Sequence, residues 1–356
     1  MDNMNQLQSD HHTVIMRRSE AVMSIILNRP HIVNSLNLDM IHTITGYMKQ
    51  ALDDERCRLV LFYGMGDRGF CAGGDIKQLA RDVRNGNMND VYQFFLEENK
   101  LDLMIFQFPK PVVVIADGIT MGGGLGISSG ADWVVATEKT RMAMPETRIG
   151  FYPDVGATGW LFQKCPPGYP EYLALTSYEM KGAECVHLGL ATHLVPSHVV
   201  SDFITTIETF NVMEFTEPEY FLFRLMEKVN GFFEDTIPKN PDRDQWVAEY
   251  FAGQSSLQEI IESLRKCSIL LAPCEGILSE LREKSPTAMV LTLKLLRHNE
   301  HLPIDEVFEV DFCAIQFIIR HPDFLEGVRA RLIDKDNKPV WHPDSIDEVD
   351  LSELHL

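Results

Sequence analysis

The chain has 356 residues, of which 45% are hydrophobic and 24% charged, as is ordinary for a soluble globular protein of one large domain or two unequal ones. Its 52 acidic and 32 basic side chains give a formal net charge of −20. This balance argues against nucleic-acid partners, because neutralising phosphates requires a basic face. No apolar stretch is long enough to span a bilayer and the first residues are polar, so we expect a cytoplasmic protein without a membrane partner.

The seven cysteines are scattered, and none forms a Cys-x-x-Cys pair. The spacing predicts neither a zinc knuckle nor a disulfide framework and favours a reducing compartment. We expect no metal site, and we interpret His11 and His12 as part of a flexible tail over residues 1–12.

In the first half of the chain, apolar runs alternate with helical patterns. Strands are expected within 13–28, at 59–63, at 112–116, at 133–136 and at 142–144, and a helix is expected at 38–52. Strands that alternate with helices indicate an α/β architecture.

After about Tyr169 the pattern is mostly helical, with a loop or hinge predicted at 235–244 and helices again over 246–331. Apolar residues recur at helical spacing within this part: Phe221, Phe223, Leu225 and Met226. We interpret them as helix-packing core; a lid over a ligand pocket is the alternative.

Three segments carry the functional signal. They read Phe-Cys-Ala-Gly-Gly-Asp at 70–75, Gly-Ile-Thr-Met-Gly-Gly-Gly-Leu-Gly at 118–126, and Pro-Glu-Thr at 145–147 running on to Pro-Asp-Val-Gly at 153–156. Two glycine-rich turns can point backbone N–H groups at one developing negative charge, and the third segment adds two carboxylates. This combination is typical of enzymes that act on acyl thioesters.

These residues resemble the crotonase (enoyl-CoA hydratase/isomerase) superfamily, and within it the 3-hydroxyisobutyryl-CoA hydrolase branch. The segments Ser-Pro-Thr-Ala at 285–288, Asp-Phe-Leu-Glu-Gly-Val-Arg-Ala at 323–330 and the tail to Pro343 are similar to that branch as well. The resemblance implies an α/β fold with a crotonase-like ββα spiral core over 13–200, followed by a mostly helical C-terminal region over 201–356 that packs on the core.

The resemblance also implies an oxyanion hole. Its donors are expected to be the N–H groups of Ala72 and Gly123, with Gly73, Gly74, Asp75 and Gly122 lining the substrate site. Such preorganised donors are worth about 3–4 kcal/mol each in the transition state.

Glu146 is the glutamate that the family places beside the thioester, and Asp154 matches an aspartate of the hydrolase branch. Hydratases of the superfamily carry a second glutamate where this chain has Gly126. The resemblance therefore implies thioester hydrolysis rather than two-glutamate hydration. Glu146 acts either as a nucleophile or as a general base on water, and the sequence leaves both routes open.

Further residues are carried over from the same resemblance. Glu98 aligns with an acidic contact to the substrate, although Glu97 is only one residue away. Arg29 and Lys77 are the expected cations for coenzyme A, with Arg81 and the pair Lys294 and Arg297 behind them.

Two competing nucleophiles have a simpler interpretation. Ser128 lies in a Gly-x-Ser-x-Gly pattern, but we expect it inside the helix after the glycine turn and not at a strand-to-helix elbow. Cys71 is expected to pack inward as a small apolar residue.

The sequence thus predicts hydrolysis of a short-chain 3-hydroxyacyl-CoA, best matched by 3-hydroxyisobutyryl-CoA of valine breakdown. No cofactor is expected beyond the coenzyme A of the substrate, and the resemblance allows a homo-oligomer. The alternatives are a hydratase or isomerase that works through Glu146 alone and a non-catalytic protein that binds coenzyme A. Tyr152, Ala157 and Thr158 depart from the branch pattern, which bears on the acyl group more than on the reaction class.

Overall fold

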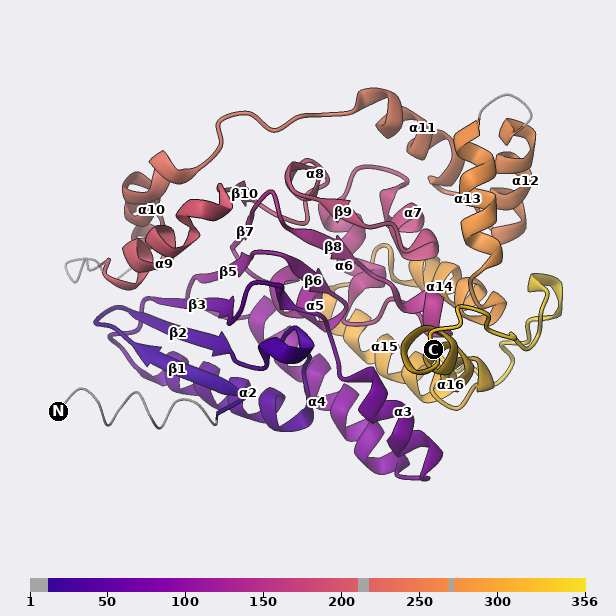
Figure 1. Cartoon of the computed structure of the whole chain (residues 1–356), viewed down its shortest axis with the longest axis horizontal. Coiled ribbons are helices and arrows are strands. Elements are labelled where there is room, and N and C mark those ends of the chain that lie inside the picture. Colours follow the sequence, from indigo (N-terminus) through magenta and orange to yellow (C-terminus); the bar gives the residue numbers. More distant parts are fainter. Residues whose placement is uncertain (1–11, 211–217, 269–271) are drawn as a thin grey trace. The chain divides into compact units, whose positions relative to one another are not determined.

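The computed structural model describes residues 12–210, 218–268 and 272–356 (Figure 1). The chain folds into two compact units that interleave along the sequence. The first comprises residues 1–74, 100–142 and 180–238, and the second residues 75–99, 143–179 and 239–356. Neither unit corresponds to one of the three predicted segments, and the predicted tail falls on residues outside the described part apart from His12.

A six-stranded sheet forms the centre of the first unit. Its order is β1 (Val14–Arg18), β2 (Val22–Leu27), β3 (Leu59–Gly64), β5 (Val112–Ala116), β7 (Trp133–Ala136) and β10 (His193–Leu194). Only β1 is antiparallel to its neighbour; the other pairs are parallel. The predicted strands at 59–63, 112–116 and 133–136 are confirmed, whereas the run within 13–28 makes two strands joined by a turn at Ser19.

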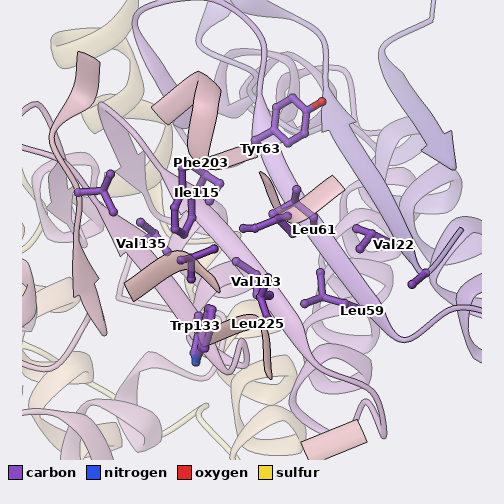
Figure 2. Packing of buried hydrophobic residues seen from close by; sticks show 14 of the residues in the cluster. Val22, Leu59, Leu61, Tyr63, Val113, Ile115, Trp133, Val135, Phe203 and Leu225 are labelled. Atoms are coloured by element: carbon purple, nitrogen blue, oxygen red, sulfur yellow. The ribbon is translucent and has the colours of Figure 1, made fainter. Parts of the chain in front are cut away.

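One face of this sheet carries the core of the first unit (Figure 2). Alternate strand residues such as Leu61, Val113 and Val135 point to this face, as the two-residue period of a strand requires. Helices α9 (Val200–Glu208) and α10 (Pro218–Val229) contribute the buried Phe203, Phe221 and Leu225 to the same cluster. The core interpretation of the helical apolar residues is confirmed for Phe221 and Leu225, whereas Phe223 is 58% exposed.

A second, four-stranded sheet has the order β4 (Gly69–Cys71), β6 (Ile119–Met121), β8 (Arg141–Ala143) and β9 (Met180–Lys181). The strand predicted at 142–144 therefore begins one residue earlier. The two glycine-rich turns follow the neighbouring strands β4 and β6 directly, so sheet pairing brings them to the same edge. The first unit also contains α2 (Leu38–Asp53), which confirms the predicted helix, α5 (Gly123–Ser129) and α8 (Ala183–His187).

The second unit is built mostly from helices. They are α3 (Ile76–Arg84), the first part of α4 (Met88–Phe106), the 3-10 helix η3 (Glu146–Ile149), α6 (Ala157–Lys164), α7 (Tyr169–Thr176), α11 (Pro241–Phe251), α12 (Leu257–Ser268), α13 (Ala272–Arg282), α14 (Pro286–Asn299), α15 (Ile304–Ile318) and α16 (Pro322–Val328). The loop predicted at 235–244 ends earlier than expected. The Asn240 side chain accepts a hydrogen bond from the Arg243 N–H, and this cap starts α11 at Pro241.

The structure contains one disulfide that the cysteine spacing did not suggest. Cys267 at the end of α12 and Cys274 in α13 are disulfide-bonded, with their Cα atoms 6.0 Å apart. The two helices are neighbours, and their packing sets this distance, which sequence spacing does not reveal. In the described part of the chain, no helix combines the length and apolar character that crossing a bilayer requires.

Candidate active site

The two predicted oxyanion turns touch each other within the first unit. Gly73 has φ +89°, and a Cβ atom added there would lie 3.1 Å from the Gly123 nitrogen. Gly122 has φ 50° and precedes the first residue of α5. Positive φ and this close approach are the reasons why the turns require glycine.

One of the two predicted donors is wrong. The Ala72 N–H donates to the carbonyl oxygen of Val33 at 2.9 Å, so it is not available to a substrate. Among the described residues, the N–H groups of Gly74 and Gly123 have no hydrogen-bond acceptor. Gly123 is the first residue of α5. Its backbone N–H lacks an intrahelical partner and lies at the positive end of the helix dipole. The two N–H groups without an acceptor are therefore those of Gly74 and Gly123. The first of them lies two residues after the predicted donor Ala72.

The structure confirms the simpler interpretation of the two competing nucleophiles. Ser128 lies inside α5, is buried, and donates to the Leu125 carbonyl oxygen at 3.2 Å. Cys71 is fully buried. Neither side chain is therefore positioned as a nucleophile. Gly126, where hydratases carry a second glutamate, lies within α5.

Three predicted carboxylates come together in the second unit. Glu98, Glu146 and Asp154 are 3%, 7% and 6% exposed. Within the described residues, Oε1 of Glu98 and Oε2 of Glu146 have no hydrogen-bond partner. Buried carboxylates without cationic partners are costly, so such a cluster is typical of a functional site.

Burial raises the pKa of each of the three acids, and the negative charge of Asp154 adds to this effect for the two glutamates. Desolvation raises the pKa of Asp154 to about 7. Desolvation, followed by the negative charge of Asp154, raises the pKa of Glu146 and of Glu98 well above their usual range. Because the charge of Asp154 raises the pKa of Glu98, Glu98 lies near Asp154; the contact of Glu98 with the substrate stays a prediction. An acid and a base for proton transfer near neutral pH are thus available.

Stacked aromatic rings come from the same segments as Glu98 and Asp154. Phe95 lies three residues before Glu98 on α4 and stacks on Phe151, with ring centroids 5.5 Å apart. Phe151 in turn stacks on Tyr152 at 5.2 Å. Residues three apart share one helix face, so Glu98 is directed to the same apolar surroundings.

The turn after Asp154 is held by a residue that the sequence analysis did not identify. Val155 and Gly156 have φ 52° and 74°, an unfavourable conformation for valine. The Gly156 N–H donates to Oδ2 of Asp311 at 2.6 Å, and the Tyr152 hydroxyl donates to the Asp311 carbonyl oxygen at 2.8 Å. Asp311 lies on α15 without any local motif, so no sequence signal pointed to it.

The segment that carries Glu146 is held from the other side by the C-terminal signature segments. A Cβ atom at Gly150 would lie 2.2 Å from the Asp323 carbonyl oxygen, and one at Gly327 would lie 2.3 Å from the Ile149 carbonyl carbon. The Ser285 hydroxyl donates to Asp323 at 2.6 Å. These glycines allow α16 to pack directly on η3, which explains how distant segments fix Glu146.

The cations predicted to bind coenzyme A lie in different surroundings. Lys77 is exposed at the start of α3, where the Asp75 side chain caps the helix by accepting from the Gln78 N–H. Arg29 donates to the Ser35 carbonyl oxygen at 2.7 Å. Arg297 forms an ion pair with the buried Glu171 at 2.6 Å, which makes it a structural residue.

Arg81, the other cation named behind the first pair, donates to the Gln78 side chain. Lys294 on α14, which was named together with Arg297, is exposed.

Comparison with known proteins defines the class. Residues 22–355 match the enoyl-CoA hydratase/isomerase family model. The chain is 33% identical to the mitochondrial 3-hydroxyisobutyryl-CoA hydrolase of Gallus gallus, over 94% of this chain and 86% of that protein. It is 32% identical to the small ribosomal subunit protein mS47 of Schizosaccharomyces pombe, over 94% and 77%. A crystal structure of a carnitinyl-CoA dehydratase from Mycobacterium thermoresistibile matches with 28% identity and a TM-score of 0.86, over 97% of this chain and 95% of that one.

The chain therefore belongs to the enoyl-CoA hydratase/isomerase family. The predicted crotonase-like α/β fold with a largely helical C-terminal part is confirmed. The similarity to 3-hydroxyisobutyryl-CoA hydrolases noted from the motifs is also confirmed over most of the chain.

Proposed function

We propose that this protein hydrolyses a short-chain 3-hydroxyacyl-CoA thioester, with 3-hydroxyisobutyryl-CoA as the preferred substrate. The observation that carries the proposal is the buried group of Glu98, Glu146 and Asp154 in a chain that has Gly126 where hydratases of the family have their second glutamate. The similarity to 3-hydroxyisobutyryl-CoA hydrolases supports the same reaction.

In this mechanism the thioester carbonyl oxygen accepts hydrogen bonds from the N–H groups of Gly74 and Gly123. Glu146 as general base takes a proton from water while the water oxygen attacks the carbonyl carbon. The tetrahedral intermediate then collapses with cleavage of the C–S bond, and a protonated carboxyl group gives its proton to the departing thiolate. Asp154, whose pKa of about 7 keeps it partly protonated at neutral pH, is the proposed donor.

The second route begins with attack by the Glu146 carboxylate itself. It forms a mixed anhydride and expels the thiolate, and water then cleaves the anhydride. A single turnover in ¹⁸O-labelled water separates the two routes, because only the anhydride route can leave label in the Glu146 carboxylate.

Glu98 is the proposed contact for the 3-hydroxyl group of the acyl chain. A carboxyl group among apolar rings discriminates strongly for a hydroxyl, because the analogue without it leaves the carboxyl group unpaired. The exposed Lys77 stays the proposed cation for the phosphates of coenzyme A, and Arg29 is the second cation that we propose.

We place this activity in valine breakdown, with coenzyme A entering only as part of the substrate. The predictions of a homo-oligomer and of no nucleic-acid partner stay predictions. So does the cytoplasmic location, since the hydrolase relatives are named as mitochondrial proteins.

The test is release of free thiol from 3-hydroxyisobutyryl-CoA, 3-hydroxypropionyl-CoA and crotonyl-CoA. We expect thiol from the hydroxyacyl substrates and its loss in Glu146→Gln. Consumption of crotonyl-CoA without thiol would instead establish double-bond chemistry.

A non-catalytic role is the second candidate, because one relative is named as a ribosomal protein. It predicts no turnover on any acyl-CoA of the panel. Co-purification with ribosomal subunits from the native host would then be the supporting measurement.

A further inference from the structure

A cavity of about 440 Å³ lies within the second unit, apart from the carboxylate group described above. It is formed by α12, α13, the start of α14 and the segment 344–347. Its floor is apolar, since Leu278, Leu281 and Met289 are each at most 5% exposed. The residues on its rim are charged. The cavity therefore offers an apolar surface beneath a polar entrance.

Lys284 is the unusual residue of this cavity. Its side chain lines the cavity and is only 2% exposed. In the described part of the chain no hydrogen bond or ion pair satisfies its ammonium group. Elsewhere in the same unit the buried Glu171 is paired with Arg297, as buried charges in proteins usually are.

The surroundings of Lys284 make this lack of a partner costly. Burial, followed by the positive charge of Arg148, lowers the pKa of Lys284 to about 8, while the negative charges of Glu280 and Glu283 partly oppose this shift and Arg331 adds to it. A bound anion would supply the missing acceptor and would offset this repulsion. Glu280 and Glu283 lie close enough to act on Lys284 but do not bond to it, so the position of an acceptor on the ammonium group is open to a bound anion.

The remaining groups restrict the chemistry of that anion. Glu262, Asp344 and Asp347 also line the cavity, together with Arg265 and Arg282. Three carboxylates disfavour a polyanion such as the diphosphate of coenzyme A. The apolar floor favours a ligand whose body is apolar and whose single negative head group reaches Lys284.

We propose that this cavity is a second ligand site, which binds a short-chain monocarboxylate with its carboxylate on Lys284 and its apolar body on Leu278, Leu281 and Met289. The site is separate from the acyl-thioester site and does not depend on the proposed hydrolysis.

Ligand-observed NMR titration with isobutyrate tests the proposal on the full-length protein. We expect saturable binding that Lys284→Met weakens about tenfold or more, because a charge-assisted hydrogen bond is lost. Lys49→Met, an exposed lysine of α2, is the matched control and should bind as the wild type does. Isobutyramide, the neutral analogue, should bind weakly to every variant.

Three outcomes would overturn the proposal. One is equal affinity of isobutyrate for the wild type and Lys284→Met, which includes no binding to either. Another is binding that survives in Lys284→Met but disappears in Glu146→Gln, which would assign the carboxylate to the thioester site. The third is binding of inorganic phosphate to the wild type where isobutyrate does not bind.

A second measurement on the wild-type protein covers the case in which Lys284→Met does not fold. Reductive methylation followed by peptide mass spectrometry gives the labelling rate of Lys284. Isobutyrate should slow this labelling several-fold while leaving Lys49 unaffected. An unchanged rate for Lys284 would contradict the proposal.

Discussion

Asp311 holds the backbone of Gly156, two residues after Asp154, through a 2.6 Å hydrogen bond from the Gly156 N–H to its Oδ2 atom. Both groups are buried, and Gly156 has a left-handed conformation that the bond helps to maintain. A residue on α15 thus positions a turn that carries a proposed catalytic acid.

Replacement of Asp311 should therefore affect catalysis and stability together. We expect Asp311→Ala to lower the free energy of unfolding by about 2 kcal/mol, because the Gly156 N–H is left buried without an acceptor. Thiol release should fall about tenfold in kcat, with little change in KM, as expected for lost positioning. Asp311→Asn keeps an acceptor and should restore most of the activity. Glu309→Ala, an exposed position on the same helix, is the control, and an equal loss there would refute a specific role for Asp311.

Glu146→Gln should reduce thiol release about a thousandfold, because the amide can neither accept a proton nor form the anhydride. The fold should survive, since a neutral amide replaces a buried carboxyl group without an ionic partner. Chemical denaturation should show a free energy of unfolding at least as high as that of the wild type. Glu97→Gln is the control on α4, and it should stay fully active. Substantial hydrolysis by Glu146→Gln would remove Glu146 from the mechanism.

The stability of the protein should depend on pH through Asp154. Its pKa is raised from 3.8 to about 7 on folding. Between these values the folded state holds more protons than the unfolded state, so the free energy of unfolding falls as pH rises across this window. At pH values above this window Asp154 is ionised, and the stability that its protonated form contributes is absent. Asp154→Asn should flatten this slope in urea unfolding measured across the window, and the exposed Asp53→Asn should not. The same slope in both variants would show that Asp154 titrates normally.

The rate of thiol release should show the opposite trend, because Glu146 acts in its ionised form. It should increase as pH rises through the elevated pKa of Glu146. Asp154→Asn should move this increase to lower pH, since the charge of Asp154 is one cause of the elevation. A pH profile that Asp154→Asn leaves in place would contradict the coupling of the two acids.

The oxyanion role of Gly123 can be tested by removing only its N–H. Proline is tolerated at the first position of a helix, so Gly123→Pro deletes the donor while α5 is retained. We expect a loss of about a hundredfold in kcat. Gly123→Ala keeps the N–H and serves as the matched control. Equal losses in the two variants would point to crowding of the turn instead of a missing donor.

The disulfide between Cys267 and Cys274 should stabilise the helix pair that it joins. Replacement of both cysteines by serine should lower the free energy of unfolding by about 2 kcal/mol, because a short closed loop restrains the unfolded chain. Cys313→Ser, which removes an exposed free thiol, is the control. A melting temperature that a reductant leaves unchanged would show that the bond is not formed in solution or does not stabilise the protein.

The sequence by itself determined the parts of this protein that local chemistry dictates. Continuous apolar runs gave the buried parallel strands, as at 59–63 and 112–116, because strands covered on both faces are apolar at every position. The glycine segments at 70–75 and 118–126 revealed turns with positive φ, and the resemblance of their neighbours identified the family. The resemblance also named Glu98, Glu146 and Asp154, three carboxylates that the structure buries near one another.

Only the tertiary structure decided which groups are free and which are already paired. The Ala72 N–H is used by Val33, which moves the expected donor to Gly74. Asp311 and Lys284 have no motif around them, and their roles arise from packing of α15 on the turn at Gly156 and of α12 on α13 and α14. The same helix packing brings Cys267 to Cys274. Hydrogen bonds, burial and the proximity of charges depend on segments that are distant in the sequence. A local sequence pattern in one segment therefore does not predict which other segment packs against it.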